Sequence, residues 1–185
     1  MADLTASSRD GVEDAELQSL IAEADRLGVP DTAVCRMLAR VPDHGKPMLR
    51  AMLVSHQQGN VDHRLKEMVR IRLARIAGDA RSASLRSRRA REAGLDEAAI
   101  EAACGDFERD DRFSAAEKAA LRYATDMYGS PETVDQAFYA GLKRHFTEAQ
   151  IMELGAFIAL HYGIYALLRT MAPAGALFAR PAAPR

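Results

Sequence analysis

Residues 67–94 read EMVRIRLARIAGDARSASLRSRRAREAG, and this stretch decides the fold. Apolar and small residues recur at helical spacing on both sides of Gly78, which interrupts the pattern. Asp62 before the first half and Gly94 after the second are typical cap residues of helices. The stretch therefore predicts two successive helices, over residues 63–77 and 79–93.

The rest of the chain is also predicted to be helical, because no window alternates polar and apolar residues as a strand does. Three capping-box patterns, Ser114–Glu117, Thr133–Gln136 and Thr147–Gln150, each precede an apolar-periodic run. With the Gly and Pro breaks, they predict helices over residues 13–27, 32–40, 46–58, 96–104, 114–128, 133–145 and from 147 onward. We expect an all-α protein, folded as a compact helical bundle.

Length and composition indicate one domain. Of the 185 residues, 48% are hydrophobic and 28% charged, and the net charge is −1, so the chain can bury a core and shows no global attraction to DNA or membranes. We expect a single domain over residues 13–172, with flexible tails at 1–12 and 173–185. Cys35 and Cys104 have neither disulfide-framework nor zinc spacing, and the N-terminus lacks a signal-peptide pattern. We therefore expect reduced thiols and a cytoplasmic location.

Residues 151–171, IMELGAFIALHYGIYALLRTM, are apolar nearly all round the predicted helix. Glu153, His161 and Arg169 interrupt the apolar run, and charges inside a membrane span are costly. We interpret the segment as a central helix rather than a membrane span. Because a small monomer buries such a helix poorly, we expect a homo-oligomer, whether dimer, trimer or hexamer.

Four pieces of sequence and the final helix carry a family resemblance. They read VDHRLKEMVRIRLARIAG (61–78), RRAREAGLDEAAI (88–100), FSAAEKAALRYA (113–124) and FYAGLKRHFTEAQIMEL (138–154). In order and spacing they resemble the carboxymuconolactone decarboxylase and alkyl hydroperoxidase D-like superfamily. The resemblance implies a compact, oligomeric, all-helical fold with a pocket beside the two helices of residues 63–93.

The reactive positions of that superfamily are altered in this chain. Its peroxidases carry a CxxCxxxH motif, with a glutamate about three turns upstream, because a thiolate attacks the peroxide and a second thiol resolves it. The matching positions here are Asp79, Ser82 and Arg86, and only the upstream glutamate, Glu67, is kept. A cysteine-based peroxidase is therefore not expected. The His and Glu of the decarboxylase branch are also missing between Asp79 and Arg91.

The residues that remain could form a polar pocket for acid–base chemistry on a small carboxylate. On this interpretation the catalytic groups are Glu67, Asp79 and His161, with a carboxylate acting as general base. An arginine would hold the substrate carboxylate by a bidentate contact. The candidate substrate-binding residues are Arg81, Ser82, Arg86, Tyr162 and Tyr165.

Each of these residues also has a structural interpretation. Asp79 could be only a helix N-cap, and Ser82 a small packing residue. Glu67 could pair with Arg70 at i+3, or with an arginine of the next helix. His161 could be an ordinary core histidine, whereas His56 and His63 lie near helix ends, where we expect them to be solvated.

Other ligand classes find little support. No histidine pair has metal-ligand spacing, so we expect neither a metal nor a cofactor. The arginines between Arg64 and Arg91 fall on several helix faces without aromatic interleaving, which favours ion pairs over a nucleic-acid surface. The leading hypothesis is a cofactor-free lyase or isomerase acting on a small carboxylated metabolite. The alternatives are a non-catalytic binding or scaffold protein and a residual hydroperoxidase.

Overall fold

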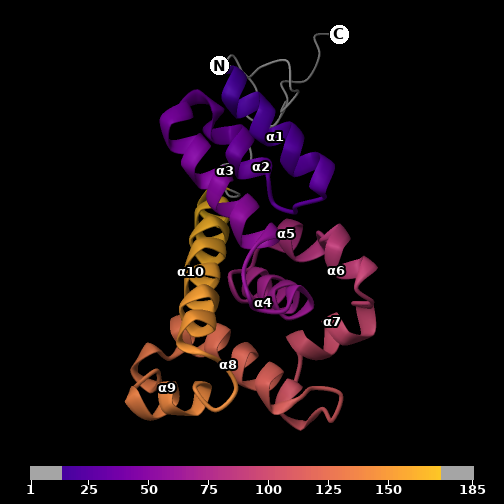
Figure 1. The fold of residues 1–185 in the computed structure, drawn as a ribbon, viewed down its shortest axis with the longest axis vertical. Coiled ribbons are helices and arrows are strands. Elements are labelled where there is room, and N and C mark those ends of the chain that lie inside the picture. The colour runs from indigo at the N-terminus through magenta and orange to yellow at the C-terminus, as the bar shows by residue number, and fades with distance from the viewer. Residues whose placement is uncertain (1–13, 172–185) are drawn as a thin grey trace.

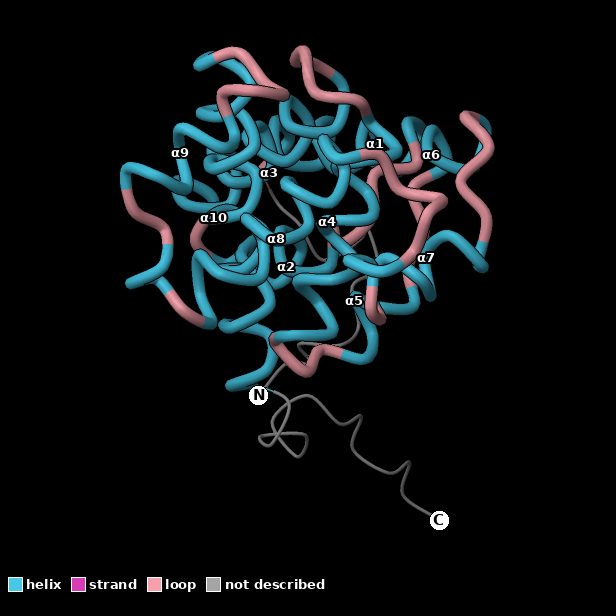
Figure 2. The backbone as a smooth tube through the Cα atoms, turned by 90° about the horizontal axis from the view of Figure 1, so that it is seen from below, coloured by secondary structure: helices cyan, strands magenta, loops and turns pink. Residues whose placement is uncertain are grey.

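The structure, a computed structural model, describes residues 14–171, and the expected tails at 1–12 and 173–185 lie outside it. Within the described residues there are helices and no strands, which confirms the all-α prediction (Figures 1 and 2). The elements are α1 (Ala15–Leu27), α2 (Ala33–Met37), η2 (Leu38–Arg40), α3 (Pro42–Gln57), α4 (His63–Ile76), α5 (Ala80–Ser84), α6 (Arg88–Glu92), α7 (Glu97–Cys104), η3 (Phe107–Arg109), α8 (Ala115–Gly129), η4 (Pro131–Thr133), α9 (Gln136–Leu142) and α10 (Glu148–Met171).

Helix α4 is the central element and is seen nearly end-on in the middle of Figure 1. It packs against α5, α7, α8 and α10, while α1 to α3 cover one end of the molecule and α8 with α9 the other. Its apolar side chains, such as Met68, Ile71 and Leu73, are buried, as expected for a core helix. Unusually, its charged residues Glu67 and Arg70 are buried as well. The candidate functional site lies around Glu67 and Arg70.

Helix α10 crosses the length of the bundle and packs against α4 and α8 (Figure 1). Its buried residues include Leu154, Phe157, Ile158 and Tyr165. Among the described helices, its segment Glu148–Arg169 is long and apolar enough to cross a membrane by length and composition. A core helix of a soluble protein has the same composition, and these packing contacts are of that kind.

Two of the three predicted capping boxes form. Ser114 and Glu117 cap α8 reciprocally, and Thr147 and Gln150 do the same before α10. At the third, Thr133 lies in η4, and the side chain of Asp135 caps α9 instead by accepting from the N–H of Phe138 at 2.8 Å. The prediction of a box at Thr133 is therefore wrong, because a better N-cap residue stands two positions later.

The predicted helix over residues 79–93 is interrupted. Leu85 is extended, with ψ 151°, and the chain forms α5 and α6 with a three-residue break between them. The break has a physical cause: the carbonyls of Ser82 and Leu85 accept hydrogen bonds from Arg70, and the N–H of Ser87 donates to Glu67. Charged groups of α4 replace the bonds that a continuous helix would have made.

Candidate functional site

Glu67 is fully buried in an ion pair with Arg70, one turn along α4. Arg70 donates from Nε to Oε2 at 2.7 Å and from Nη2 to Oε1 at 2.9 Å, and the N–H of Ser87 donates to Oε1 at 2.7 Å. Burial alone raises the pKa of Glu67, but Arg70 and the Ser87 N–H outweigh it, so that pKa lies below its usual value. Glu67 is thus an ionised carboxylate with both oxygens engaged.

Arg70 joins four segments of the chain. Besides Glu67, Arg70 donates from Nη1 to Asp31 at 2.7 Å and to the carbonyl of Ser82 at 3.0 Å, and from Nη2 to the carbonyl of Leu85 at 2.7 Å. Asp31 lies between α1 and α2 and also accepts the hydroxyl proton of Tyr165, from α10, at 2.8 Å. We call Asp31, Glu67, Arg70 and Tyr165 the Arg70 cluster; it is a buried network of two carboxylates around one guanidinium.

A second ion pair, between the buried Lys66 and the half-buried Glu153, fixes α10 against the turn between α3 and α4. Lys66 donates to the carbonyls of Ser55 and Gln58 at 2.8 and 2.9 Å, and to Glu153 of α10 at 2.9 Å. Glu153 also accepts from the N–H of Asn60 at 2.6 Å. With the Arg70 cluster, this pair sets the position of α10 relative to α3 and α4.

Three buried histidines lie between those helices: His56 at the end of α3, His63 at the start of α4 and His161 in α10. The ring of His56 is 5.6 Å from that of His63 and 5.3 Å from that of His161. His63 contacts the hydroxyl of Ser87 at 2.8 Å, and His161 Nδ1 lies 3.4 Å from the hydroxyl of Tyr165. We call these three residues the histidine cluster.

Most ring nitrogens of the histidine cluster lack a partner. Among residues 14–171, no hydrogen bond reaches either nitrogen of His56, Nδ1 of His63 or Nε2 of His161. Burial lowers the pKa of all three, to about 4 for His63 and well below 6.5 for the other two, with positive neighbours adding to the effect. The rings are therefore neutral at pH 7, and each carries one nitrogen that can accept a proton and one that can donate.

An apolar groove lies next to the histidine cluster. It has a volume of about 310 Å³ and runs between α3 and α10, where Ala51, Val54, Ser55, Gln58, Gly59, Glu153, Ala156, Phe157 and Leu160 line it. The Phe157 ring lies 4.3 Å from His161 and 5.8 Å from His56. Phe157 therefore stands between the groove and the two histidines.

The predicted site residues do not all lie together. Glu67, His161 and Tyr165 meet around the Arg70 cluster. Asp79 caps α5 by accepting from the Ser82 N–H at 3.1 Å and from its hydroxyl at 2.6 Å. The remaining predicted residues are placed elsewhere: Arg81 is exposed on α5, and Tyr162 stacks on Tyr128 at 3.6 Å.

Arg86 does not meet Glu67. Its guanidinium turns toward α7 and forms a bidentate pair with Glu97, both contacts at 2.8 Å. It borders an open hollow of about 470 Å³ together with Arg75. Because the next residue, Ser87, gives its N–H to Glu67, the backbone here separates the inward carboxylate from the outward guanidinium. The cation beside Glu67 is Arg70.

Sequence reasoning missed Asp31 and misjudged two histidines. His56 and His63 were expected to be solvated, but both are buried, because α3 and α4 fold back on each other and bring them together across the turn. The i+3 spacing of Glu67 and Arg70 was a usable signal for their pair. Asp31 offered none, since it lies 39 positions from Arg70.

Replacing Arg70 by Lys is expected to destabilise the fold by about 3 kcal/mol, because one ammonium group cannot serve two carboxylates and two carbonyls in fixed directions. Urea unfolding measures the difference. Arg109→Lys is the matched control, since that side chain is 90% exposed. It should stay within about 0.5 kcal/mol of wild type. A similarly small change for Arg70→Lys would contradict the role given to the guanidinium.

Acidification is expected to destabilise the fold through the histidine cluster. Since the folded-state pKa values lie below the usual 6.5, the unfolded chain binds more protons at intermediate pH. The free energy of unfolding therefore keeps the full contribution of these histidines above pH 6.5. It falls toward pH 4, by up to about 1.4 kcal/mol per pH unit for each histidine. In urea unfolding at several pH values, His161→Phe should flatten this dependence and the exposed His145→Phe should not. An unchanged slope in His161→Phe would contradict the assignment.

Comparisons with known proteins indicate a family and a shared fold. The sequence profile of the carboxymuconolactone decarboxylase family matches residues 42–126, from the start of α3 into α8. This segment contains Glu67, Arg70, His56 and His63, but neither Asp31 nor His161. A comparison with curated protein sequences finds no match.

Several solved structures share the fold. The apo form of the debrominase Bmp8 is 22% identical with a TM-score of 0.70, covering 88% of this chain and 90% of that one. A cysteine-to-alanine variant of that debrominase in complex with 2,3,4-tribromopyrrole is 21% identical with a TM-score of 0.70, covering 85% and 84%. An uncharacterised peroxidase-related protein from Ralstonia eutropha, with an alkylhydroperoxidase AhpD core, is 16% identical with a TM-score of 0.65, covering 96% and 95%. At these identities the likeness is one of fold.

Proposed function

We propose that this chain, whose residues 42–126 match the carboxymuconolactone decarboxylase family, is a cofactor-free lyase or isomerase acting on a small carboxylated metabolite. One observation carries the proposal: His56 and His161 are buried, neutral and adjacent, and three of their four ring nitrogens make no hydrogen bond within the described chain. Buried polar atoms without partners are costly, and they gather at sites where chemistry uses them.

His161 is the proposed general base. The hydroxyl of Tyr165 donates a hydrogen bond to Asp31 at 2.8 Å, and its oxygen accepts one from Arg70 at 3.3 Å. The second lone pair of that oxygen can accept a hydrogen bond from His161 Nδ1, which lies 3.4 Å away. We assign the proton of the neutral ring to Nδ1 on this basis, which leaves Nε2 as the proton acceptor. Tyr165 and Asp31 are positioning residues, because they orient the imidazole without touching the substrate.

His56 is the proposed partner in proton transfer, since its ring lies 5.3 Å from that of His161. The negative charge of Glu67 favours the protonated form of His56, although burial and His161 outweigh it. Glu67 itself is held in its ion pair and acts through its charge rather than as the base. Acid–base chemistry of this kind suits decarboxylation, isomerisation or elimination.

The groove between α3 and α10 supports a small, largely apolar substrate. Rotation of Phe157 would connect the groove to His161 Nε2. The ammonium group of Lys66 lies 5.9 Å from the Phe157 ring and is paired with Glu153, which lines the groove. A small aromatic or lactone acid fits this lining, and the tribromopyrrole complex of the debrominase supports a substrate of ring size.

A non-catalytic binding or scaffold role is the second candidate, and a specific observation favours it. Each charged residue at a motif position already has a partner within the chain: Glu67 with Arg70, Asp79 with Ser82 and Arg86 with Glu97. The exposed apolar side chains of Val54 and Met152, beside the groove and on α10, support the proposal of a homo-oligomer in either case.

A panel of small aromatic acids, lactone acids and halogenated pyrroles, incubated with the protein in D₂O and followed by NMR, tests the proposal. Turnover or exchange of a carbon-bound proton is expected with at least one compound. His161→Phe and His56→Phe should lower its rate at least about 100-fold, because the proton carrier is removed.

His145→Phe serves as the matched control, since that histidine is exposed and remote from the cluster. Treatment with a thiol-alkylating agent should also leave the rate unchanged, because neither cysteine takes part in the proposed step. Burial raises the pKa of Cys35 to about 12 and also raises that of Cys104, so neither is a reactive thiolate. Full activity in His161→Phe would refute the assigned base, and binding without turnover of any compound would favour the scaffold.

A further inference from the structure

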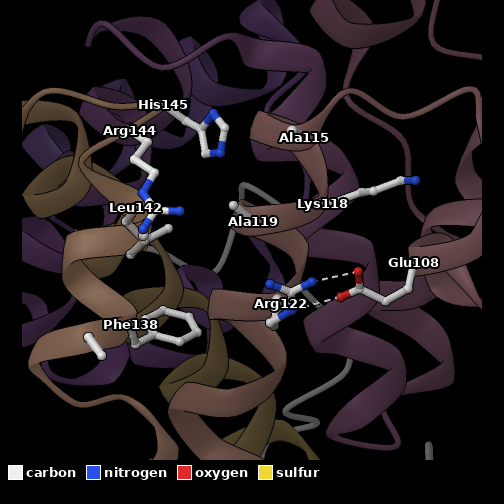
Figure 3. A pocket seen from close by; sticks show the side chains of 11 residues that line it. Glu108, Ala115, Lys118, Ala119, Arg122, Phe138, Leu142, Arg144 and His145 are labelled. Carbon is white, nitrogen blue, oxygen red and sulfur yellow. Dashed lines mark hydrogen bonds and ion pairs between the residues drawn. The ribbon is translucent and has the colours of Figure 1, made fainter.

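A second hollow lies between α8 and α9, at the end of the molecule opposite α1 to α3 (Figures 1 and 3). Its volume is about 370 Å³, within the size range of small-molecule sites. The lining residues come from η3, α8, α9 and the turn after α9: Glu108, Ala115, Lys118, Ala119, Arg122, Ala137, Phe138, Gly141, Leu142, Arg144 and His145. None belongs to the Arg70 cluster, the histidine cluster or the groove.

The charged groups of this hollow are mostly positive. Lys118, Arg122 and Arg144 stand against one carboxylate, that of Glu108. Figure 3 shows Arg144 and His145 on one side and Arg122 facing them, while Lys118 extends away from the centre. The lining therefore carries a net charge of +2 with His145 neutral, although the whole chain has a net charge of −1.

The two central guanidinium groups differ in what they already bind. Arg122 is held by Glu108 through contacts at 2.8 Å from Nε and 2.6 Å from Nη2, and its Nη1 makes no hydrogen bond within residues 14–171. The side chain of Arg144 has no hydrogen-bond or ion-pair partner in the same part of the chain. One guanidinium is thus fixed in place and the other is available for an incoming anion.

The hollow also has apolar lining residues, of which Leu142 lies beside Arg144 (Figure 3). Leu142 is buried, and Phe138 is half-buried and packs on Tyr123 with ring centroids 5.8 Å apart. Ala119 lies between the arginines on the α8 side (Figure 3). A site with a cationic end and an aromatic wall selects a ligand with an anionic group attached to an apolar body, rather than a bare inorganic anion.

We propose that the hollow between α8 and α9 is a binding site for a small aromatic carboxylate, with Arg144 and Arg122 holding the carboxylate and Phe138 packing on the ring. This ligand class follows from the lining, in which the guanidinium groups lie next to the apolar side chains. This site is independent of the acid–base site, since no residue is shared and the two lie on different helix pairs.

Isothermal titration calorimetry at low salt tests the site, with benzoate as the probe and benzamide as its neutral counterpart. Benzoate should bind to the wild-type chain and benzamide should not. Arg144→Ala should weaken benzoate binding at least about tenfold, because it removes the free guanidinium. Arg109→Ala is the control, since Arg109 is an exposed arginine outside the hollow, and it should bind as wild type does.

Three results would overturn the proposal: no binding of benzoate, equal binding of benzamide, or unchanged affinity in Arg144→Ala. Inorganic phosphate distinguishes the ligand classes. If phosphate binds as tightly as benzoate, the aromatic part of the proposal is wrong. Phe138→Ala should weaken benzoate binding and leave phosphate unaffected. Because Arg144 makes no ion pair in the described chain, its removal should leave the fold intact, which an unchanged thermal midpoint would establish.

Discussion

The guanidinium of Arg70 is the interaction on which the rest of the structure depends. It sits in the centre of the bundle, fully buried, between Glu67 of its own helix and Asp31 from the segment before α2. A charge in such a place is tolerated only when hydrogen bonds satisfy it completely, and three side chains and two carbonyls do so here. Apart from Glu67, these partners come from chain segments before and after α4.

This requirement explains the shape of the site. To bring the carbonyls of Ser82 and Leu85 to Arg70, the helix after Gly78 stops, and the extended residues that follow turn the next side chains to opposite sides. Arg86 is sent to the surface, and Ser87 gives its N–H to Glu67. On the side of α5, the charges of Glu67 and Arg70 are therefore satisfied by backbone groups. On the side of α3 and α10, the neutral rings of His56 and His161 lie next to them. Asp79 and Ser82 form a helix cap at the start of α5.

Local patterns predicted most of the architecture. Cap residues such as Asp62 and Ser114, and the apolar run of α10, depend on near neighbours in sequence, so they could be interpreted without a structure. The break at Leu85 could not, because its cause is a side chain fifteen residues away. For the same reason the burial of His56 escaped prediction: helix periodicity near a chain turn does not say which element covers the end. Long-range polar contacts, rather than propensity, separate the predicted site from the one found.

A double-mutant cycle on Glu67 and Arg70 tests the central claim most directly. Glu67→Gln, Arg70→Met and the double variant would be unfolded in urea, and the coupling energy between the two positions calculated from the four free energies of unfolding. Arg70→Met leaves the Glu67 carboxylate buried without its cation, and Glu67→Gln leaves Arg70 with Asp31 as its one carboxylate partner in the cluster. We therefore predict a coupling of at least about 2 kcal/mol, with the double variant more stable than the sum of the single effects implies. Additive effects, with a coupling near zero, would show that the two groups do not depend on each other, and would contradict the account.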